Sequence, residues 1–286
     1  MKILVLGGTR FFGRRLVHML IEDGHDVTIA TRGLAQDDFG SSVKRVIVQR
    51  TSPDSMKEKL RGKSWDIVYD SLAYCSNDVK YALDVLECGR YIMTSTGAVY
   101  HRLHPNIYEE EFNPLEKELV WCGRLDYDYG EIKRHAECAM FQKYSHVNAV
   151  AVRLPIVIGN DDYTGRLKFY VDHILEGKPM SIDKMDAWHS LVDAGEAADF
   201  MRFLGNSDIK GPVNGCSGDS VKIADIINYV KLKSGKESVL TKDGDNAPYN
   251  GYENYSLNTD RAESAGFRFK SINSFIYGIL DEYMNC

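Results

Sequence analysis

The most informative absence in this 286-residue sequence is a long hydrophobic run, since no stretch of about 18 apolar residues occurs. A membrane-spanning helix is therefore not expected, and the opening residues also lack the layout of a signal peptide. The six cysteines are scattered without a Cys-x-x-Cys pair, which favours free thiols in a reducing cytosol over a disulfide framework. Together these absences predict a cytoplasmic protein without a membrane partner.

Positive charge is scarcer than negative charge, because 35 Lys and Arg stand against 41 Asp and Glu for a net charge of −6. This balance argues mildly against a nucleic-acid or anionic-membrane partner, although it allows a locally basic pocket. Ser-His-Asp, P-loop and zinc-site patterns are also missing. The composition, 44% hydrophobic and 27% charged, is ordinary for a globular protein with one large domain or two intimate ones.

Short apolar, β-rich runs alternate with helical patterns through the first half of the chain. Near-continuous apolar strands separated by helices predict a parallel sheet covered on both faces, the doubly wound α/β or Rossmann architecture. The predicted strands are residues 2–6, 27–30, 46–48, 67–69, 91–93 and 149–154. We therefore expect a dinucleotide-binding domain over residues 1–154 and a smaller, interleaved substrate-binding region over 155–286. In that region, helices are predicted at 166–176 and 222–233 and a loop at 236–254.

A glycine-rich turn follows the first predicted strand and leads into a helix. This turn, hereafter the glycine turn, consists of Gly7, Gly8, Thr9, Arg10, Phe11, Phe12 and Gly13. Unpaired amides at the start of a helix and the helix dipole both face a phosphate, and glycines let the backbone approach it. The turn therefore predicts the phosphate site of a dinucleotide, in which Arg10 places a cation where a third glycine is expected.

Tyr129 and Lys133 lie four residues apart, so they share one face of a predicted helix. A nearby cation favours the phenolate, which lets a tyrosine transfer protons closer to neutral pH. The pattern alone is weak, because Tyr229 and Lys233 repeat it and a solvated helix face explains either pair. The position of Tyr129 within the alternating region favours a role in chemistry.

Hydroxyl side chains cluster in residues 94–100, directly after the strand at 91–93. Ligands of a parallel sheet bind beyond the carboxyl ends of its strands. A hydroxyl there can hydrogen-bond a substrate oxygen as the charge on that oxygen changes. Ordinary capping of the strand end by Ser and Thr is an equal explanation.

In this order, the elements resemble the extended short-chain dehydrogenase/reductases, the NAD(P)-dependent epimerase/dehydratase family, over essentially the whole chain. Arg10 in the glycine turn and residues 70–74 resemble an atypical branch that includes bacterial epimerase-like and chloroplast RNA-binding relatives. The other elements that carry the resemblance are residues 96–100, 129–133, 153–159, 192–198, 256–262 and Gly266-Phe267.

The resemblance implies a division of labour among these residues. Tyr129 is the proton-transfer acid or base, and Lys133 lowers the pKa of its phenol and holds the nicotinamide ribose. Thr96 binds the reacting oxygen, with Ser95 as the weaker alternative. The nicotinamide side is lined by Thr94, Leu72, Ala73 and Pro155. Hydride then moves between the cofactor and a substrate carbinol carbon. A homodimer is also expected from the resemblance alone.

The residues after the second strand bear on the choice of cofactor. An NAD site usually offers Asp or Glu there to the ribose hydroxyls, whereas an arginine accommodates a 2′-phosphate. Residues 30–32 contain no acid, so Arg10 and Arg32 predict NADP in preference to NAD. Pairing of either arginine with a surface carboxylate is the alternative. Gln49 and Arg50 stand where many relatives carry an Asp that contacts adenine.

The candidates for substrate binding are Thr96, Arg166, Trp188, His189 and Tyr249. In the family, an arginine before the late acidic element commonly binds the diphosphate of a nucleotide sugar, and the aligned residue here is His189. A neutral imidazole is a poor replacement, for which Arg166 can compensate. Packing explains Trp188 and Tyr249 at least as well. We therefore predict a hydroxylated, sugar-like small molecule, with a nucleotide sugar as one form of it.

Three weaker patterns complete the sequence. His101 and His104 lack a third ligand, so they indicate a loop and no metal site. The carboxylates at 161–162 and the run at 109–111 are expected to be solvated.

The sequence as a whole predicts an NAD(P)-dependent oxidoreductase or epimerase. The alternative is a cofactor-binding Rossmann protein with an RNA-binding or regulatory role.

Overall fold

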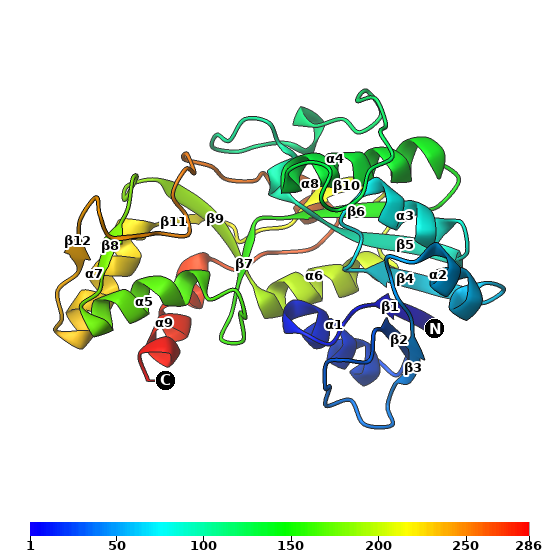
Figure 1. The fold of residues 1–286 in the computed structure, drawn as a ribbon, viewed down its shortest axis with the longest axis horizontal. Coiled ribbons are helices and arrows are strands. Elements are labelled where there is room, and N and C mark those ends of the chain that lie inside the picture. The colour runs from blue at the N-terminus through cyan, green and yellow to red at the C-terminus, as the bar shows by residue number, and fades with distance from the viewer. Residues whose placement is uncertain (286) are drawn as a thin grey trace.

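The computed structural model of the chain describes residues 1–285, and Cys286 lies outside the described residues. Its main body is a seven-stranded parallel sheet in the order β10-β6-β5-β4-β1-β2-β3 (Figure 1). The order reverses between β1 and β4, which is where doubly wound sheets bind their ligands. The strands are β1 (Lys2–Leu6), β2 (Asp26–Thr31), β3 (Lys44–Ile47), β4 (Ser64–Asp70), β5 (Glu87–Thr96), β6 (Ala149–Leu154) and β10 (Gly211–Asn214).

Helices cover both faces of this sheet (Figure 1). On one face α1 (Phe11–Glu22) packs against α6 (Ala194–Asn206). On the other face lie α2 (Pro53–Leu60), α3 (Ser76–Leu83) and α4 (Tyr129–Cys138), which continues as a π-helical turn over Ala139–Lys143. Short 3₁₀ turns follow β5 at Gly97–Val99 and precede α4 at Glu109–Glu111.

The two faces of β1 show why this strand lies at the centre of the sheet. Ile3 and Val5 join the apolar layer formed with α1 and α6, whereas Leu4 and Leu6 join the layer formed with α2, α3 and α4. All four side chains are fully buried. Successive strand residues point to opposite faces, so a continuous apolar run places the strand between two helical layers.

A smaller C-terminal lobe extends from one end of the sheet (Figure 1). Its helices are α5 (Arg166–Glu176), α7 (Ile223–Ser234) and α9 (Ile276–Met284), which share an apolar core with β7 (Ile156–Ile158) and β9 (Trp188–Asp193). β11 (Ser220–Lys222) pairs with β9, and β8 (Pro179–Ser181) pairs with β12 (Val239–Leu240) and β13 (Asp245–Asn246). A 3₁₀ turn at Ile272–Ser274 completes the lobe, whereas the short helix α8 (Asp260–Ser264) packs against β10 of the main sheet.

The doubly wound sheet predicted from the sequence is confirmed, with several strands longer than predicted. The chain returns to the main sheet after residue 155, because α6 and β10 both belong to it. The predicted loop at 236–254 contains the short strands β12 and β13, which pair with β8. Among residues 1–285, no helix is long and apolar enough to cross a membrane.

Candidate active site

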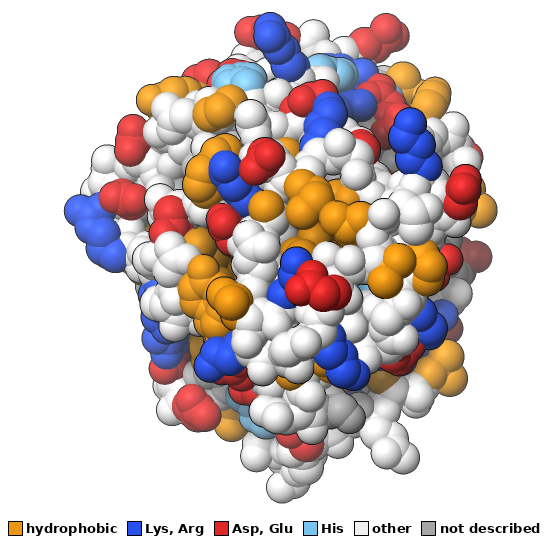
Figure 2. Space-filling model, turned by 90° about the vertical axis from the view of Figure 1, so that its left-hand side faces the viewer, with side chains coloured by type: hydrophobic (Ala, Val, Ile, Leu, Met, Phe, Trp, Pro, Cys, Tyr) orange, Lys and Arg blue, Asp and Glu red, His pale blue; other side chains and the backbone are white. Residues whose placement is uncertain are grey.

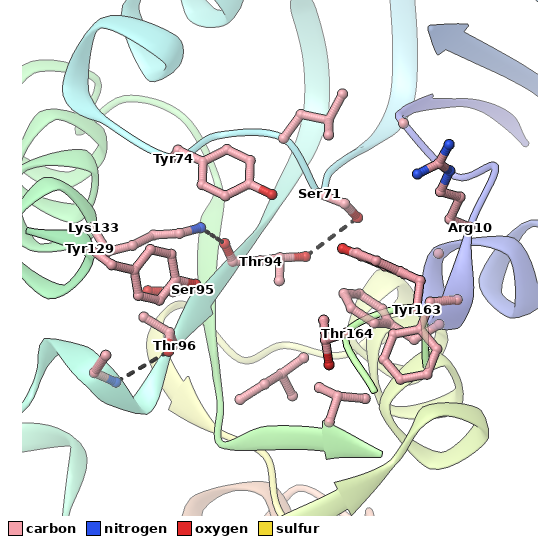
Figure 3. A pocket seen from close by; sticks show the side chains of 18 of the residues that line it. Arg10, Ser71, Tyr74, Thr94, Ser95, Thr96, Tyr129, Lys133, Tyr163 and Thr164 are labelled. Atoms are coloured by element: carbon pink, nitrogen blue, oxygen red, sulfur yellow. Dashed lines mark hydrogen bonds between the residues drawn. The ribbon is translucent and has the colours of Figure 1, made fainter. Parts of the chain in front are cut away.

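A cavity of about 1140 Å³ lies at the carboxyl ends of the main-sheet strands. Its wall is formed by residues that follow β1 to β6, by the starts of α4 and α5, and by a segment near residue 250. Figure 3 shows Arg10 of the glycine turn on one side of this space and Tyr129 and Lys133 of α4 on the other. Segments far apart in sequence therefore meet around one hollow.

The glycine turn has a steric requirement for glycine. Gly7 and Gly8 have φ angles of 99° and 87°, in the left-handed region that favours glycine. A Cβ on Gly8 would lie 2.8 Å from Val17 Cγ2 and 2.9 Å from Val5 Cγ1. A Cβ on Gly13 would lie 3.3 Å from the Cα of Gly8. The absence of these side chains lets α1 begin directly against the end of β1.

The N-terminus of α1 faces this cavity without a side-chain cap. Arg10 is the N-cap residue and makes no capping hydrogen bond, and the first turn contains no acidic residue. Phe11 has a φ angle of 51°, a strained value that is common at ligand sites. Free helix amides and the helix dipole suit an anion, so this cradle fits the pyrophosphate of a dinucleotide.

Arg10 and Arg32 are exposed residues of the cavity wall. The Arg10 guanidinium lies 6.0 Å from the ring centre of Tyr163. Within residues 1–285 neither arginine forms an ion pair, so the carboxylate pairing considered for them does not occur there. Both cations are therefore available to an anionic ligand.

A buried ion pair lies behind the same side of the cavity. Arg50 donates to Asp70 at 2.5 Å, and Asp70 also accepts from the Tyr91 hydroxyl at 2.6 Å and from the Leu72 amide at 2.9 Å. The Arg50 side chain is 5% exposed and that of Asp70 is 0% exposed. Asp70 therefore fixes the turn after β4, and Leu72 of that turn lies against Gly7.

Tyr129 is the first residue of α4, because Asp128 caps the helix by accepting from the Glu131 amide at 2.9 Å. Half of its side chain is exposed, but burial around the hydroxyl raises the pKa of the phenol. A hydrogen bond with the Thr96 side chain and the positive charge of Arg166 oppose that rise in pKa. Thr96 Oγ1 accepts from the Ala98 amide at 3.2 Å, so its own proton is available for the phenol oxygen.

Lys133 is buried, and its Nζ donates to the carbonyls of Ala73 at 2.8 Å and Thr94 at 2.7 Å. Burial lowers the pKa of Lys133 to about 8, although Asp70 and other carboxylates oppose this change. The expected lowering of the Tyr129 pKa by Lys133 does not occur in this structure, where that pKa is raised. The ammonium donates to two carbonyls, and Arg166 is the cation whose charge opposes the rise in the Tyr129 pKa.

Ser95 and Thr96 have different environments. The Ser95 hydroxyl donates to Glu137 at 2.5 Å, and Glu137 is also bound by Arg153 at 2.6 Å in a pair that is 0% exposed on both sides. Ser95 is thus committed to a buried network, which leaves Thr96 as the hydroxyl next to Tyr129. Arg153 also donates to the Glu109 and Phe112 carbonyls, so this network holds the segment after β5.

The expectation of a fully solvated acidic run at 109–111 is wrong for Glu109. This side chain is buried and accepts from the Asn214 amide at 2.8 Å, and burial raises its pKa. Glu110 is exposed as expected. His104 Nε2 donates to Glu111 at 2.6 Å, and that hydrogen bond raises the pKa of His104. No group of three or more potential metal ligands occurs in residues 1–285.

Most sequence-predicted site residues line the cavity. Those on its wall are Gly7, Thr9, Arg10, Phe11, Phe12, Gly13, Arg32, Leu72, Thr94, Thr96, Tyr129, Lys133, Pro155 and Arg166. Ala73 is fully buried beneath the wall, where its carbonyl accepts from Lys133.

The structure does not bring Trp188, His189 or Tyr249 to the wall. Trp188 is exposed under Lys222, at 4.9 Å from the Nζ atom to the ring centre. His189 and Tyr249 are buried behind the wall, with ring centres 5.8 Å apart. Packing therefore accounts for these two rings, and burial lowers the pKa of His189 to about 4.

Sequence reasoning missed several residues of the wall, among them Tyr74, Arg124, Tyr163, Tyr252 and Tyr255. Tyr74 follows β4, so its place at a strand end was a usable signal. The other four come from segments outside the strand ends, and no local pattern marks them. Tyr252 and Tyr255 are brought in by the pairing of Tyr255 with His189 of β9.

Comparison with known proteins agrees with this geometry. A model of the NAD dependent epimerase/dehydratase family matches residues 3–215. A chloroplast stem-loop binding protein of 41 kDa from Arabidopsis thaliana is 25% identical over 254 residues, which are 82% of this chain. The chain spans 63% of the length of that curated relative.

Solved structures show the same fold at low identity. UDP-glucose 4-epimerase from Thermotoga maritima, solved with UDP-glucose, has a TM-score of 0.76 at 16% identity and covers 100% of this chain and 99% of its own. UDP-glucose 4-epimerase from Thermus thermophilus, solved with NAD, has a TM-score of 0.72 at 17% identity, with 99% of each chain covered. With the family match over most of its length, the chain belongs to the NAD dependent epimerase/dehydratase family.

Proposed function

We propose that this protein is an NAD(P)-dependent oxidoreductase or epimerase that acts on a hydroxylated, sugar-like small molecule. The observation that carries the proposal is one cavity that holds the glycine turn together with Thr96, Tyr129 and Lys133. Helix amides that suit a pyrophosphate and a phenol that can transfer a proton thus share one space. A nucleotide sugar is one form of the substrate, and residues 155–286 contribute Arg166 and three tyrosines to its end of the cavity.

In this proposal the bound dinucleotide supplies hydride transfer, and the protein supplies binding, orientation and proton transfer. Tyr129 takes the proton of the reacting hydroxyl during oxidation and returns it during reduction. Thr96 donates to the phenol oxygen or to the substrate oxygen, which stabilises negative charge on either. Arg166 favours the phenolate through its charge. Lys133 holds the β4 and β5 ends together and offers its remaining N–H to the nicotinamide ribose.

We propose NADP as the preferred cofactor. Support comes from Arg10 and Arg32, which are unpaired cations on the wall, and from residues 30–32, which contain no acid. A 2′-phosphate would satisfy a guanidinium by two parallel hydrogen bonds. A location in the cytosol and a homodimer stay predictions.

The decisive experiment compares Tyr129→Phe with the neighbouring Tyr127→Phe. UDP-glucose and free hexoses serve as probes, with NADP⁺ or NAD⁺ and nicotinamide fluorescence as the readout. Loss of the phenol should lower turnover by about 10² to 10⁴, the usual contribution of general acid–base catalysis, while cofactor affinity is kept. Tyr127 lies outside the cavity wall, so its variant should behave as wild type. Equal turnover in Tyr129→Phe and wild type would remove the catalytic assignment.

RNA binding is the alternative from another class, and it rests on the resemblance of the glycine turn and residues 70–74 and on the name of the Arabidopsis relative. The net charge of −6 opposes it, and the end of the molecule in Figure 2 intersperses acidic and basic side chains without a large basic patch. A titration with a stem-loop RNA at low and high salt separates the two classes, because phosphate contacts weaken as salt rises. No binding at low salt would eliminate the alternative.

A further inference from the structure

Lys133 is a charged group in a place that disfavours charge. It is fully enclosed by α4, β4 and β5, and its ammonium donates to two carbonyls, which leaves one N–H for another partner. Burial lowers the pKa of Lys133 to about 8, so part of the population would lose its proton in mildly alkaline solution. Nearby carboxylates favour the charged form, and the charge also needs a favourable contact on the side of the cavity.

Tyr74 is the side chain that meets this need in the cavity. The centre of its ring lies 5.0 Å from Lys133 Nζ, 4.7 Å from the Arg124 guanidinium carbon and 6.5 Å from the ring centre of Tyr129. Figure 3 shows the Tyr74 ring beside the Lys133 ammonium at the edge of the cavity. The face of an aromatic ring is negative and attracts a cation within about 6 Å.

The position of this ring is fixed by its surroundings. The Tyr74 amide donates to Asp78 Oδ2 at 2.9 Å, and Arg124 Nε donates to the same oxygen at 2.9 Å. Arg124 also donates to the Leu72 carbonyl at 2.9 Å. Asp78 is 1% exposed, so the Tyr74 backbone and Arg124, one of the cations beside the ring, are anchored on a buried carboxylate of α3.

We propose that Tyr74 is a positioning residue, whose ring face keeps the Lys133 ammonium charged and directs it toward the cavity. It acts through Lys133 and takes no proton itself. The proposal deepens the proposed function, because its consequence for turnover depends on Lys133 acting in the site. The ionisation of Lys133 does not depend on turnover, so the two can fail separately.

Other charges around Lys133 set the background. Carboxylates of three elements raise its pKa: Asp70 of β4, Glu137 of α4 and Asp78 of α3. Arg124 lowers it. Tyr129 presents its ring at 6.0 Å from Nζ, one ångström farther than Tyr74. Tyr74 is the nearer of the two rings. Removal of the neighbouring Arg124 should shift the Lys133 pKa in the direction opposite to removal of the Tyr74 ring, so the two variants can be compared.

The experiment titrates Lys133 in the complete protein without substrate, by NMR of ¹³Cε-labelled lysine, with Lys133→Met to assign the resonance. Tyr74→Leu removes the ring and should lower the Lys133 midpoint by about one pH unit, from the usual strength of a cation–π contact. Tyr74→Phe keeps the ring and should leave the midpoint unchanged. Arg124→Gln should raise the midpoint, because it removes a like charge.

Two results would overturn the proposal. One is a Tyr74→Leu protein that is folded and titrates Lys133 at the wild-type midpoint. The other is a Tyr74→Phe protein that shifts the midpoint as far as Tyr74→Leu, which would assign the effect to the hydroxyl. Where Tyr74→Leu does not fold, pentafluorophenylalanine at position 74 keeps the shape and reverses the ring charge. An unchanged midpoint with that residue would equally overturn the proposal.

Discussion

The two ends of the cavity are built in different ways. The N-terminal wall, which comprises its lining residues between 7 and 51, carries Arg10, Arg32 and Arg50 and no carboxylate. The C-terminal wall, which comprises the lining residues at 162–166 and 250–255, carries Arg166, Asp162 and three tyrosines. One wall is cationic and fixed to strand ends, and the other is aromatic and nearly neutral in charge.

This difference teaches how one cavity can hold one common and one variable ligand. Backbone amides and arginines at strand ends recognise phosphate in any dinucleotide, and their positions follow from the sheet. Tyrosine rings on the opposite wall offer apolar faces with few charges, a surface that suits a hydroxylated ring. Loops position functional side chains more freely than strands do, so we propose that this wall sets substrate choice.

The largest effect is expected in the buried network around Arg153, near the C-terminal wall. Arg153→Met leaves Glu137 charged and unpaired in a fully buried place, which typically costs about 3–5 kcal/mol of unfolding free energy. The substitution also removes the hydrogen bonds from Arg153 to the Glu109 and Phe112 carbonyls. These two residues follow Ile107, which pairs with Leu257. Urea denaturation measures the loss. The exposed pair Lys168–Asp172 is the control, since Lys168→Met should cost less than about 1 kcal/mol. Equal losses would show that the buried pair stabilises the fold no more than an exposed one.

The next effect concerns the N-terminal wall alone. Gly8→Val adds a Cβ where Val5 and Val17 leave 2.9 and 2.8 Å, at a φ angle of 87°. We expect a loss of stability of about 1–3 kcal/mol and a fall in NADPH affinity of at least tenfold, because α1 must move away from β1. Gly24→Ala is the control, since its φ of 75° is also positive but nothing lies within 4 Å of the added Cβ. Retained NADPH affinity in Gly8→Val would separate the glycine turn from the cofactor.

Much of the fold was predictable because its signals are local. The strands β1, β2, β4, β5 and β6 are apolar runs, and each such run was recognised without knowledge of its neighbours. The two-residue strands β12 and β13 were not predicted, because they exist only through pairing with β8. The return of α6 and β10 to the sheet depends on contacts with α1 and β6, which no local pattern encodes.

The residues of the candidate site also divide into those marked by local sequence signals and those brought in by long-range contacts. Residues of the N-terminal wall and of α4 were found from spacing, since strand ends and helix faces place them. The family resemblance favoured Thr96 over Ser95, but the physical reason was not visible in the sequence, because the buried Glu137–Arg153 pair that binds Ser95 comes from α4 and β6. Tyr252 and Tyr255 lie on a chain segment positioned by long-range pairing, so their place on the C-terminal wall was invisible.

A smaller effect tests the charge of the N-terminal wall. Arg32→Gln removes an unpaired cation from the wall and should weaken NADPH binding about tenfold, while NADH binding is unchanged, since only NADPH carries the 2′-phosphate. Arg14→Gln is the control, because Arg14 lies off the wall and pairs with Asp38 at 2.9 Å. Fluorescence titration with both nucleotides measures the ratio. A wild-type protein that prefers NADH would contradict the assignment.

The smallest expected effect concerns His189, a neutral side chain buried behind the C-terminal wall. Burial lowers the pKa of His189 to about 4 from an ordinary 6.5. Between these pH values the imidazole is therefore protonated in the unfolded chain and neutral in the folded chain. Stability therefore falls as pH drops from 6.5 toward 4, and His189 accounts for about 1 kcal/mol of the loss between pH 7 and 5.5. His189→Phe should remove that part of the slope, measured by urea denaturation at both pH values. His146→Gln, at an exposed position, should keep it. An unchanged slope in His189→Phe would mean that the imidazole reaches water in the folded protein and can carry a charge behind the C-terminal wall.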